Sequence, residues 1–315
     1  MTAVAVPAAR NYAHSLSDSL DTNWLTPGVR SMLLSTLAFF LANAFVKQVG
    51  HIPAMEIVFF RCVTATTMCL VGLYRAKADP IGSNRLALLL RGLFGTTALY
   101  CFFITLQQLP LASAQTIQYL SPIFTATIAI FILGEGVRPI QWLFYAVAFG
   151  GVLVIDQVDT RISPFYLSLG IVSAFCSGMA YNLVRSMRGK EHPLTIVLHF
   201  QLTGMVVGFI SLFFAWETPH GWDWLFLLCV GVFSQLGQIF LTNALQREAI
   251  AGVAIVNYTG LVYAITVGWI IFGEEQSVYS LLGMALVVAG VLMSVMYGRR
   301  QQRLAALAEL DVTQA

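Results

Sequence analysis

Charge is what this sequence lacks most: Asp, Glu, Lys and Arg make up 10% of its 315 residues, against about 25% in a typical soluble domain. Apolar residues make up 58%, and the mean hydropathy is +0.77. Such a chain has too little polar surface to cover a water-soluble fold and too many apolar residues to stay disordered. With 17 basic and 15 acidic residues, it also lacks the positive charge of a nucleic-acid-binding protein. The composition therefore indicates an integral protein of the lipid bilayer.

The cysteines and the missing motifs exclude further kinds of chemistry. Each of the five cysteines lies in an apolar run and none forms a CxxC pair, so we expect small buried side chains rather than disulfides or a metal site. The zinc-binding HExxH, the nucleophile motif GxSxG and the glycine-rich phosphate-binding loop of ATPases are absent. We expect neither an enzyme nor an ATP-driven pump, and no cofactor.

Long apolar runs dominate what is present. A membrane-spanning helix needs about 20 mostly apolar residues, and ten segments meet this requirement. Spanning strands would instead alternate over about ten residues, and these runs are longer and uniformly apolar. The expected spans are residues 29–48, 54–74, 86–106, 112–133, 140–156, 165–185, 194–215, 224–245, 252–272 and 279–297. The predicted fold class is an all-α polytopic membrane protein with ten transmembrane helices.

The basic residues predict how these helices are oriented, because cytoplasmic loops are rich in Lys and Arg. With the N-terminus inside, 14 of the 17 basic residues lie at the cytoplasmic side, Arg91 among them. Lys47 and Arg161 lie outside, and Arg61 lies within the second helix. Residues 1–27 lack the layout of a cleavable signal peptide. We therefore expect both termini in the cytoplasm and the chain in the bacterial inner (plasma) membrane.

The two halves of the chain match each other at an offset of 139 residues. The matched positions include Gly134-Glu135 with Gly273-Glu274, and Tyr119 with Tyr258. Matches at such residue types under one offset indicate an internal duplication. Each repeat holds five helices, so the second enters the membrane from the opposite side, and inverted repeats are typical of secondary transporters. The expected organisation is an N-terminal tail (1–27), two five-helix repeats (28–157 and 158–298) and a C-terminal tail (299–315).

Short motifs in both halves carry a resemblance to a known family. They are Phe60-Arg61, Arg91-Gly92, Ala112-x-Ala114, Pro122 and Leu133-Gly134-Glu135 in the first half, and Ala251, Gly273-Glu274, Gly283 and Gly290 in the second. Over residues 29–297 the chain resembles the drug/metabolite transporter superfamily, EamA type. Leu261 stands at the counterpart of Pro122, so a helix break there need not occur in both halves. The resemblance implies a carrier of metabolites or drugs, often an exporter.

Polar side chains at bilayer depth usually face the interior of the bundle. Gln115, Gln118 and Tyr119 share one face of the fourth helix, and the repeat places Asn257 and Tyr258 at the positions of the last two. We expect the two amide–tyrosine pairs to face each other across a central cavity, the alternative being hydrogen bonds that only join helices. The candidate substrate-binding residues are Asn43, Tyr100, Gln115, Gln118, Tyr119, Tyr181, Gln235, Gln238, Asn257 and Tyr258.

Charged and titratable groups near the membrane interior are candidates for gating or proton coupling. They are Lys47, Glu56, Arg61 and His199. The favoured structural interpretation is a local Glu56–Arg61 or Lys47–Glu56 pair, and the alternative is an outer gate or a proton site. For His199, packing is favoured over a proton relay. The helix-end residues Glu135 and Glu274 are interpreted as loop caps or as gate partners of basic residues.

The predicted function is a secondary transporter that moves a small organic solute by alternating access. The sequence offers no acidic group deep in the membrane for a cationic drug, which favours neutral, zwitterionic or anionic solutes such as amino acids or related amphipathic metabolites. A multidrug efflux carrier is the alternative; a membrane-embedded enzyme, a channel or a scaffold subunit is less favoured. We expect a small-molecule substrate, no metal, no nucleic-acid partner, and a monomer or homodimer in the bilayer.

Overall fold

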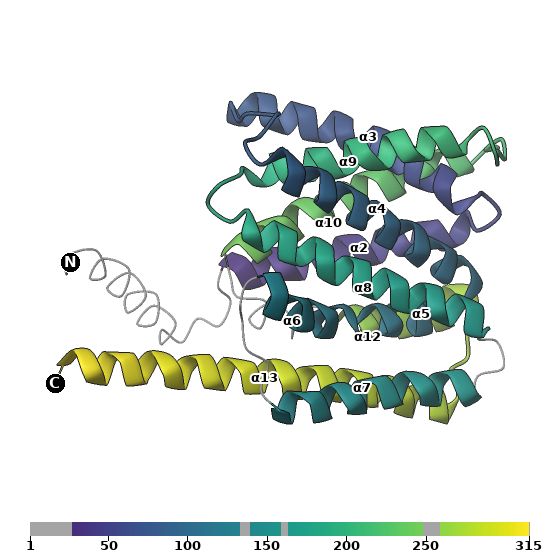
Figure 1. Ribbon diagram of the computed structural model, residues 1–315. Helices are drawn as coiled ribbons and strands as arrows, with labels where there is room; N and C mark the ends of the chain where they lie inside the picture. The colour runs from purple at the N-terminus through teal and green to yellow at the C-terminus, as the bar shows by residue number, and fades with distance from the viewer. Residues whose placement is uncertain (1–26, 133–138, 159–162, 248–258, 315) are drawn as a thin grey trace.

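The computed structural model describes residues 27–132, 139–158, 163–247 and 259–314, and these form a bundle of roughly parallel and antiparallel helices (Figure 1). The helices are α2 (Pro27–Gln48), α3 (Ala54–Ala76), α4 (Arg85–Gln108), α5 (Leu111–Gln118), α6 (Ser121–Ile132), α7 (Pro139–Val158), α8 (Pro164–Ser186), α9 (Pro193–Ser211), α10 (Asp223–Arg247), α12 (Thr259–Phe272) and α13 (Val278–Gln314).

These helices confirm the predicted fold class. In the described part of the chain, eight spans are long and apolar enough to cross a membrane, with α5 and α6 together forming the span Leu111–Ile132. The shorter apolar helices Pro139–Ile155 and Thr259–Phe272 bring the number to the ten that the sequence predicts. The last helix, α13, continues to Gln314 and so runs through the segment expected to be a tail.

The fourth span is interrupted in the middle. Helix α5 ends at Gln118, and α6 begins at Ser121 after a turn. Pro122 has no amide hydrogen, so it cannot donate to the carbonyl four residues earlier. The chain restarts when the Ile123 amide donates to the Leu120 carbonyl over 2.9 Å. Such discontinuous helices are typical of transporters, where they border the substrate site.

The helix contacts follow a two-fold relation between the halves. Helix α2 packs on α10 as α8 packs on α4, and α3 packs on α10 as α9 packs on α4. The pairs α3–α9 and α7–α13 join helices with the same place in the two repeats. Exchanging the halves therefore reproduces these contacts, as expected for inverted repeats.

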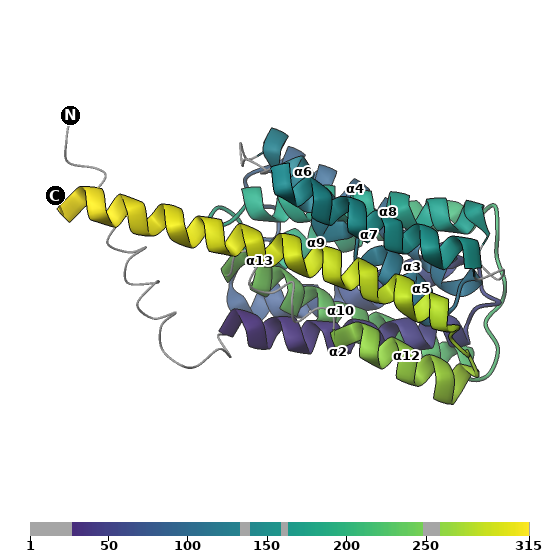
Figure 2. The same ribbon diagram turned by 90° about the horizontal axis from the view of Figure 1, so that it is seen from below.

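Helices α7 and α13 form a pair at one edge of the bundle (Figures 1 and 2). A Cβ atom added to Gly151 would lie 2.6 Å from the Gly283 carbonyl oxygen. One added to Gly290 would lie 2.6 Å from the Phe144 carbonyl oxygen. Glycine at these positions allows the close approach of backbones that membrane helices use in place of hydrophobic burial.

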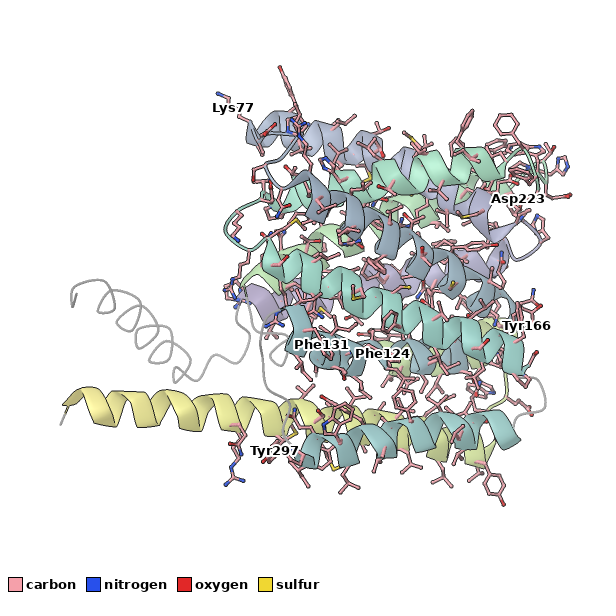
Figure 3. The ribbon with its side chains drawn as sticks, in the orientation of Figure 1. Lys77, Phe124, Phe131, Tyr166, Asp223 and Tyr297 are labelled. Atoms are coloured by element: carbon pink, nitrogen blue, oxygen red, sulfur yellow. The ribbon has the colours of Figure 1, made fainter. Side chains whose placement is uncertain are left out.

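Apolar side chains cover the outside of the bundle and polar ones gather inside. Phe131, Val206 and Trp269 are exposed on the surface, whereas Gln201 and Gln235 are fully buried. Figure 3 shows that Lys77 and Asp223, both charged, lie at opposite ends of the helices. This distribution suits a lipid environment and places the hydrogen-bonding groups where a solute could meet them.

Candidate functional site

A cavity of roughly 150 Å³ lies among the buried polar groups. Its lining comes from helices of both repeats, including α2, α4, α5, α8, α10 and α12. The polar lining side chains are Thr36, Asn43, Arg61, Arg91, Gln115, Gln118, Tyr119, Ser121, Ser173, Ser177, Tyr181, Ser234 and Gln238. Six of the predicted substrate-binding residues, Asn43, Gln115, Gln118, Tyr119, Tyr181 and Gln238, therefore meet at one cavity.

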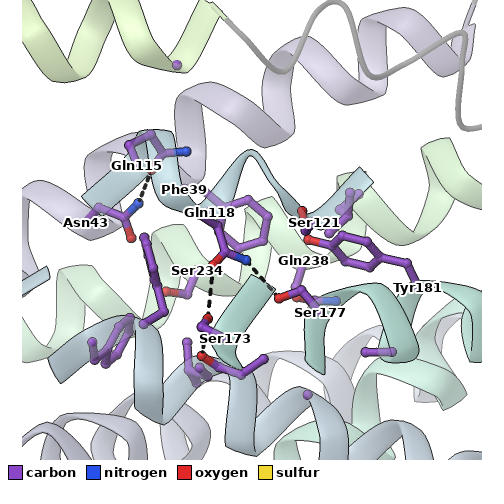
Figure 4. Close-up of a pocket in the computed structure, with 18 of the residues that line it drawn as sticks. Phe39, Asn43, Gln115, Gln118, Ser121, Ser173, Ser177, Tyr181, Ser234 and Gln238 are labelled. Atoms are coloured by element: carbon purple, nitrogen blue, oxygen red, sulfur yellow. Dashed lines mark hydrogen bonds between the residues drawn. The ribbon is translucent and has the colours of Figure 1, made fainter. Parts of the chain in front are cut away.

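One side of the cavity is a set of hydrogen-bonded neutral groups that we call the amide wall: Asn43, Gln115, Gln118, Ser173 and Ser177 (Figure 4). The Asn43 side-chain amide donates to Gln115 Oε1 over 3.3 Å. Gln118 Nε2 donates to Ser177 Oγ over 2.8 Å, and Ser173 Oγ lies 2.9 Å from Gln118 Oε1. Each bond joins different helices, so these residues both connect helices and line the cavity; that they bind a substrate stays a prediction.

Tyr119 lies at the break between α5 and α6 and connects the halves. Its side chain is 1% exposed. A Cβ atom added to Gly260 of α12 would lie 2.8 Å from the Tyr119 hydroxyl oxygen. The repeat partners Asn257 and Tyr258 lie outside the described residues, so the facing of two amide–tyrosine pairs stays a prediction.

The cavity lining also contains two positively charged side chains, Arg61 of α3 and Arg91 of α4, which we call the arginine pair. Their guanidinium carbons lie 5.2 and 4.4 Å from the centre of the Phe200 ring. Arg61 is 1% and Arg91 3% exposed. The sequence counts Arg91 toward the cytoplasmic side, near the start of the span 86–106; the structure places it past the first turn of α4, which begins at Arg85, and buries it in the bundle.

Arg61 is held by a chain of amides behind the cavity. Its Nη1 donates to Gln201 Oε1 over 3.1 Å, and Gln201 Nε2 donates to Gln235 Oε1 over 2.9 Å. Gln235, predicted as a cavity residue, is thus buried in this chain and does not line the cavity. Gln201 was missed, although a lone amide in the apolar run 194–215 is a signal that could have identified it.

Two other predicted residues lie away from the cavity. Tyr100 is 38% exposed on the surface of α4. His199 is half-buried, and its Nδ1 lies 3.0 Å from the Thr195 carbonyl oxygen one turn earlier in α9. This bond gives His199 a partner within its own helix, and whether the residue only packs or also relays protons stays a prediction.

At the end of the bundle predicted to face outward, charges from the two repeats meet. Lys47 of α2 forms an ion pair with Glu274, and its Nζ also donates to the Leu109 carbonyl over 2.9 Å. Glu274 Oε2 accepts from the Leu111 amide, the first residue of α5, over 2.7 Å. We call this contact the Lys47–Glu274 latch. It agrees with the interpretation of Glu274 as a cap and a partner of a basic residue; Glu135 lies outside the described residues.

The structure does not contain the ion pairs that the sequence predicts for Glu56. Glu56 Oε2 accepts from the Glu217 amide over 2.9 Å, so its carboxylate faces the α9–α10 connection. Lys47 instead reaches across to the other repeat, and Arg61 points into the cavity. Both Glu56–Arg61 and Lys47–Glu56 were therefore wrong as contacts.

At the other end of the helices, Glu191 in the α8–α9 connection accepts hydrogen bonds from the α3–α4 connection of the other repeat. Its Oε1 accepts from the Ser83 hydroxyl over 2.6 Å and from the Ser83 and Asn84 amides over 2.7 Å each. Burial alone would raise the pKa of Glu191, but these hydrogen bonds outweigh it and hold the pKa below its ordinary value.

The described residues offer binding groups rather than reactive ones. Within them no three His, Cys, Asp or Glu side chains are grouped to hold a metal ion. The described lining of the cavity contains amides, hydroxyls, aromatic rings and the arginine pair, with no carboxylate. This set can hold a solute by hydrogen bonds, apolar contact and positive charge.

Comparison with known proteins identifies a family of transporters. The sequence model of the EamA-like transporter family matches residues 26–156 and, a second time, residues 164–296. The chain is 30% identical over 267 residues to the pseudopaline exporter CntI of Pseudomonas aeruginosa, covering 84% of this chain and 94% of the relative. It is 30% identical over 282 residues to human solute carrier family 35 member G1, covering 83% and 77%.

A solved structure has the same fold. It is a crystal structure of a protein with which the TM-score is 0.63 at 17% sequence identity, and the alignment covers 87% of this chain and 97% of the other. At this identity the likeness concerns the arrangement of helices.

Proposed function

The chain belongs to the EamA-like transporter family, and from this we propose that it is a secondary transporter that moves a small organic solute through its central cavity by alternating access. Transport of small solutes across a membrane is common to the family and to its named relatives, which are transporters and not enzymes. The cavity is our assignment of the substrate site, and the bacterial inner membrane is our assignment of its location.

The observation that carries the proposal is a polar cavity lined from both repeats inside an otherwise apolar bundle. Hydrogen-bonding groups are costly at bilayer depth, so they gather where a solute or its pathway needs them. The interrupted span between α5 and α6 borders this cavity through Gln118, Tyr119 and Ser121. Substrate sites of inverted-repeat transporters lie at such an interface between repeats.

Alternating access requires a contact that opens at one end of the bundle. The Lys47–Glu274 latch supports this role because Lys47 belongs to the repeat 28–157 and Glu274 to the repeat 158–298. A rocking motion of one repeat against the other would separate the two side chains. We propose the latch as the gate at the outer end, with the two repeats as the moving units.

The residues also bear on the class of solute and on direction. A multidrug carrier for cations is disfavoured, because the described lining offers two guanidinium groups and no carboxylate. The name of the Pseudomonas relative, an exporter, supports export. Amino acids and related amphipathic metabolites remain our proposed class. Proton coupling through Glu56 or His199 stays a prediction, and loss of a pH-gradient effect in Glu56→Gln is its test.

Counterflow in proteoliposomes tests the proposal. Vesicles with purified protein are loaded with one unlabelled compound from a panel of amino acids and small organic acids, and uptake of the labelled compound is followed. The proposal predicts saturable uptake that rises with internal solute for a subset of the panel, and none in protein-free vesicles. Uptake that never saturates or never responds to internal solute contradicts a carrier, and so does formation of a product without transport.

A further inference from the structure

The arginine pair has no anionic partner among the described residues. The ion pairs there are Lys47–Glu274 and His51–Asp223, and neither involves Arg61 or Arg91. Arg61 Nε, Arg91 Nε and Arg91 Nη1 are buried without a hydrogen-bond acceptor. Two fixed positive charges are thus enclosed in a space whose described lining holds no negative one.

A buried cation without a counter-charge is unfavourable, so this arrangement needs a reason. The face of Phe200 compensates only in part, through a cation–π contact with each guanidinium. Since both guanidinium carbons lie over this one ring, they are no farther apart than the sum of their distances to its centre, 9.6 Å. Both side chains also line the same cavity, so a single small molecule bound there can reach both groups.

The surroundings hold Arg91 in place as a binding group. A Cβ atom added to Gly95, one turn after Arg91 in α4, would collide with Arg91 Nη1 and lie 2.8 Å from Phe200 Cδ2. Because Gly95 has no side chain, the Arg91 guanidinium can lie against α4 at this position, beside the Phe200 ring. Arg61 is fixed from behind by Gln201. Preorganised side chains of this kind lose little freedom when a ligand binds.

We propose that the transported solute is a small organic anion, and that the arginine pair binds its carboxylate. A guanidinium is a planar fork that matches the two oxygens of a carboxylate. The amide wall offers neutral donors and acceptors to the rest of the molecule, and Phe39, Phe102 and Phe103 offer apolar contact to its carbon skeleton. This inference rests on the proposed function, because it names the class of solute for that same cavity.

A binding experiment that needs no transport tests the inference. The unfolding temperature of the purified protein in lipid nanodiscs is measured with acids and their amides as matched pairs: succinate with succinamide, glutarate with glutaramide, and glutamate with glutamine. Glycerol 3-phosphate is included as a non-carboxylate anion. We expect one or more acids to stabilise the protein, their amides to do so at least tenfold more weakly in apparent Kd, and glycerol 3-phosphate to act no better than the best acid.

Variants locate the binding. Arg91→Gln and Arg61→Gln should each abolish stabilisation by the acids, whereas Arg85→Gln, an exposed arginine on the same helix, should leave it unchanged. Without ligand, Arg91→Gln should unfold at a temperature no lower than the wild type, because it removes an unpaired buried charge. A purely structural arginine would instead give an unfolding temperature that falls by several degrees.

The outcomes separate this inference from the proposed function. If no acid stabilises the protein, if amides act as well as acids, or if Arg91→Gln responds as the wild type does, the proposal is overturned while counterflow of a neutral solute could still succeed; glycerol 3-phosphate acting better than every acid would overturn the carboxylate assignment in favour of a phosphate. If an acid binds through the arginine pair but shows no counterflow, binding stands and transport fails.

Discussion

The Lys47–Glu274 latch and the arginine pair differ in how their cations are balanced. Lys47 lies over the Phe272 ring, much as the arginines lie over Phe200. Lys47, however, also has a carboxylate partner and a backbone carbonyl. Arg91 has neither among the described residues. The charge of Lys47 is thus neutralised within the protein, whereas no anion among the described residues neutralises the arginine pair.

This difference indicates what each region does. A complete ion pair between two repeats can hold one conformation and release it when the repeats move. A cluster of buried cations without an anion gains most from a molecule that brings the missing negative charge. The following variants test this difference by removing or exchanging charged and polar groups in each region.

The largest effect is expected when the arginine pair loses one charge. Arg91→Gln should lower the rate of solute exchange about 100-fold, since a charge-assisted hydrogen bond contributes about 1.5–3 kcal/mol. Arg91→Lys keeps the charge but loses the fork, and it should retain intermediate exchange. Counterflow at matched protein density is the measurement, with Arg85→Gln as the control. Equal exchange by all four proteins would remove the arginine pair from the account.

A smaller effect is expected at the latch. Glu274→Gln should slow exchange about tenfold, because it removes a charge partner of Lys47 and weakens the cap on α5. The double variant Lys47→Glu with Glu274→Lys restores the ion pair but not the bond from the Leu111 amide, so partial recovery is predicted. The measurement is the exchange rate of Glu274→Gln, of Lys47→Glu, of Glu274→Lys and of the double variant, each compared with the wild type. No recovery in a folded double variant would argue against a gating ion pair.

Tyr119 tests the neutral part of the cavity. Tyr119→Phe removes only the hydroxyl and should reduce exchange about fivefold, the worth of a net hydrogen bond of about 1 kcal/mol. Tyr119→Ala should reduce it further while folded protein is still obtained. The repeat predicts the same response for Tyr258→Phe and Tyr258→Ala. Unchanged kinetics in the variants of both tyrosines would refute their placement at the substrate site.

The smallest effect on transport is expected at Glu191, which lies in the α8–α9 connection and belongs to neither region. Its pKa is lower in the folded than in the unfolded chain, so its stabilising contribution is present above the unfolded pKa of about 4.5 and is lost as the pH falls through the folded pKa. Glu191→Gln should therefore unfold at a lower temperature than the wild type at pH 7, with the gap closing below pH 4.5. Exchange at pH 7 should stay near the wild-type rate. A gap that persists in acid would contradict this assignment.

Much of the fold could be predicted from the sequence because its signal is local. Runs of apolar residues mark the spans, and one offset between the halves marks the duplication. Pro122 also marks the place where the fourth span breaks, since the missing amide hydrogen is a property of the residue itself. The amide wall could be predicted in part, because Gln115 and Gln118 share a helical face.

Contacts between the halves were beyond the sequence. The Lys47–Glu274 latch joins residues 227 positions apart, and no local pattern favours Glu274 over the nearby Glu56. Arg91 was counted at the cytoplasmic side because it lies near the start of the span 86–106, and such a count does not tell which way a side chain near a helix end points. Only the course of α4 and the space left by Gly95 show that its side chain turns inward.

The most direct test is counterflow of the panel acid that stabilises the wild-type protein most, in proteoliposomes that contain wild-type, Arg85→Gln or Arg91→Gln protein at equal density. We predict that internal acid accelerates saturable uptake by the wild type and by Arg85→Gln, and that Arg91→Gln stays near the background of empty vesicles although it is folded. Uptake by Arg91→Gln at the wild-type rate would contradict the claim that the arginine pair carries the transported anion.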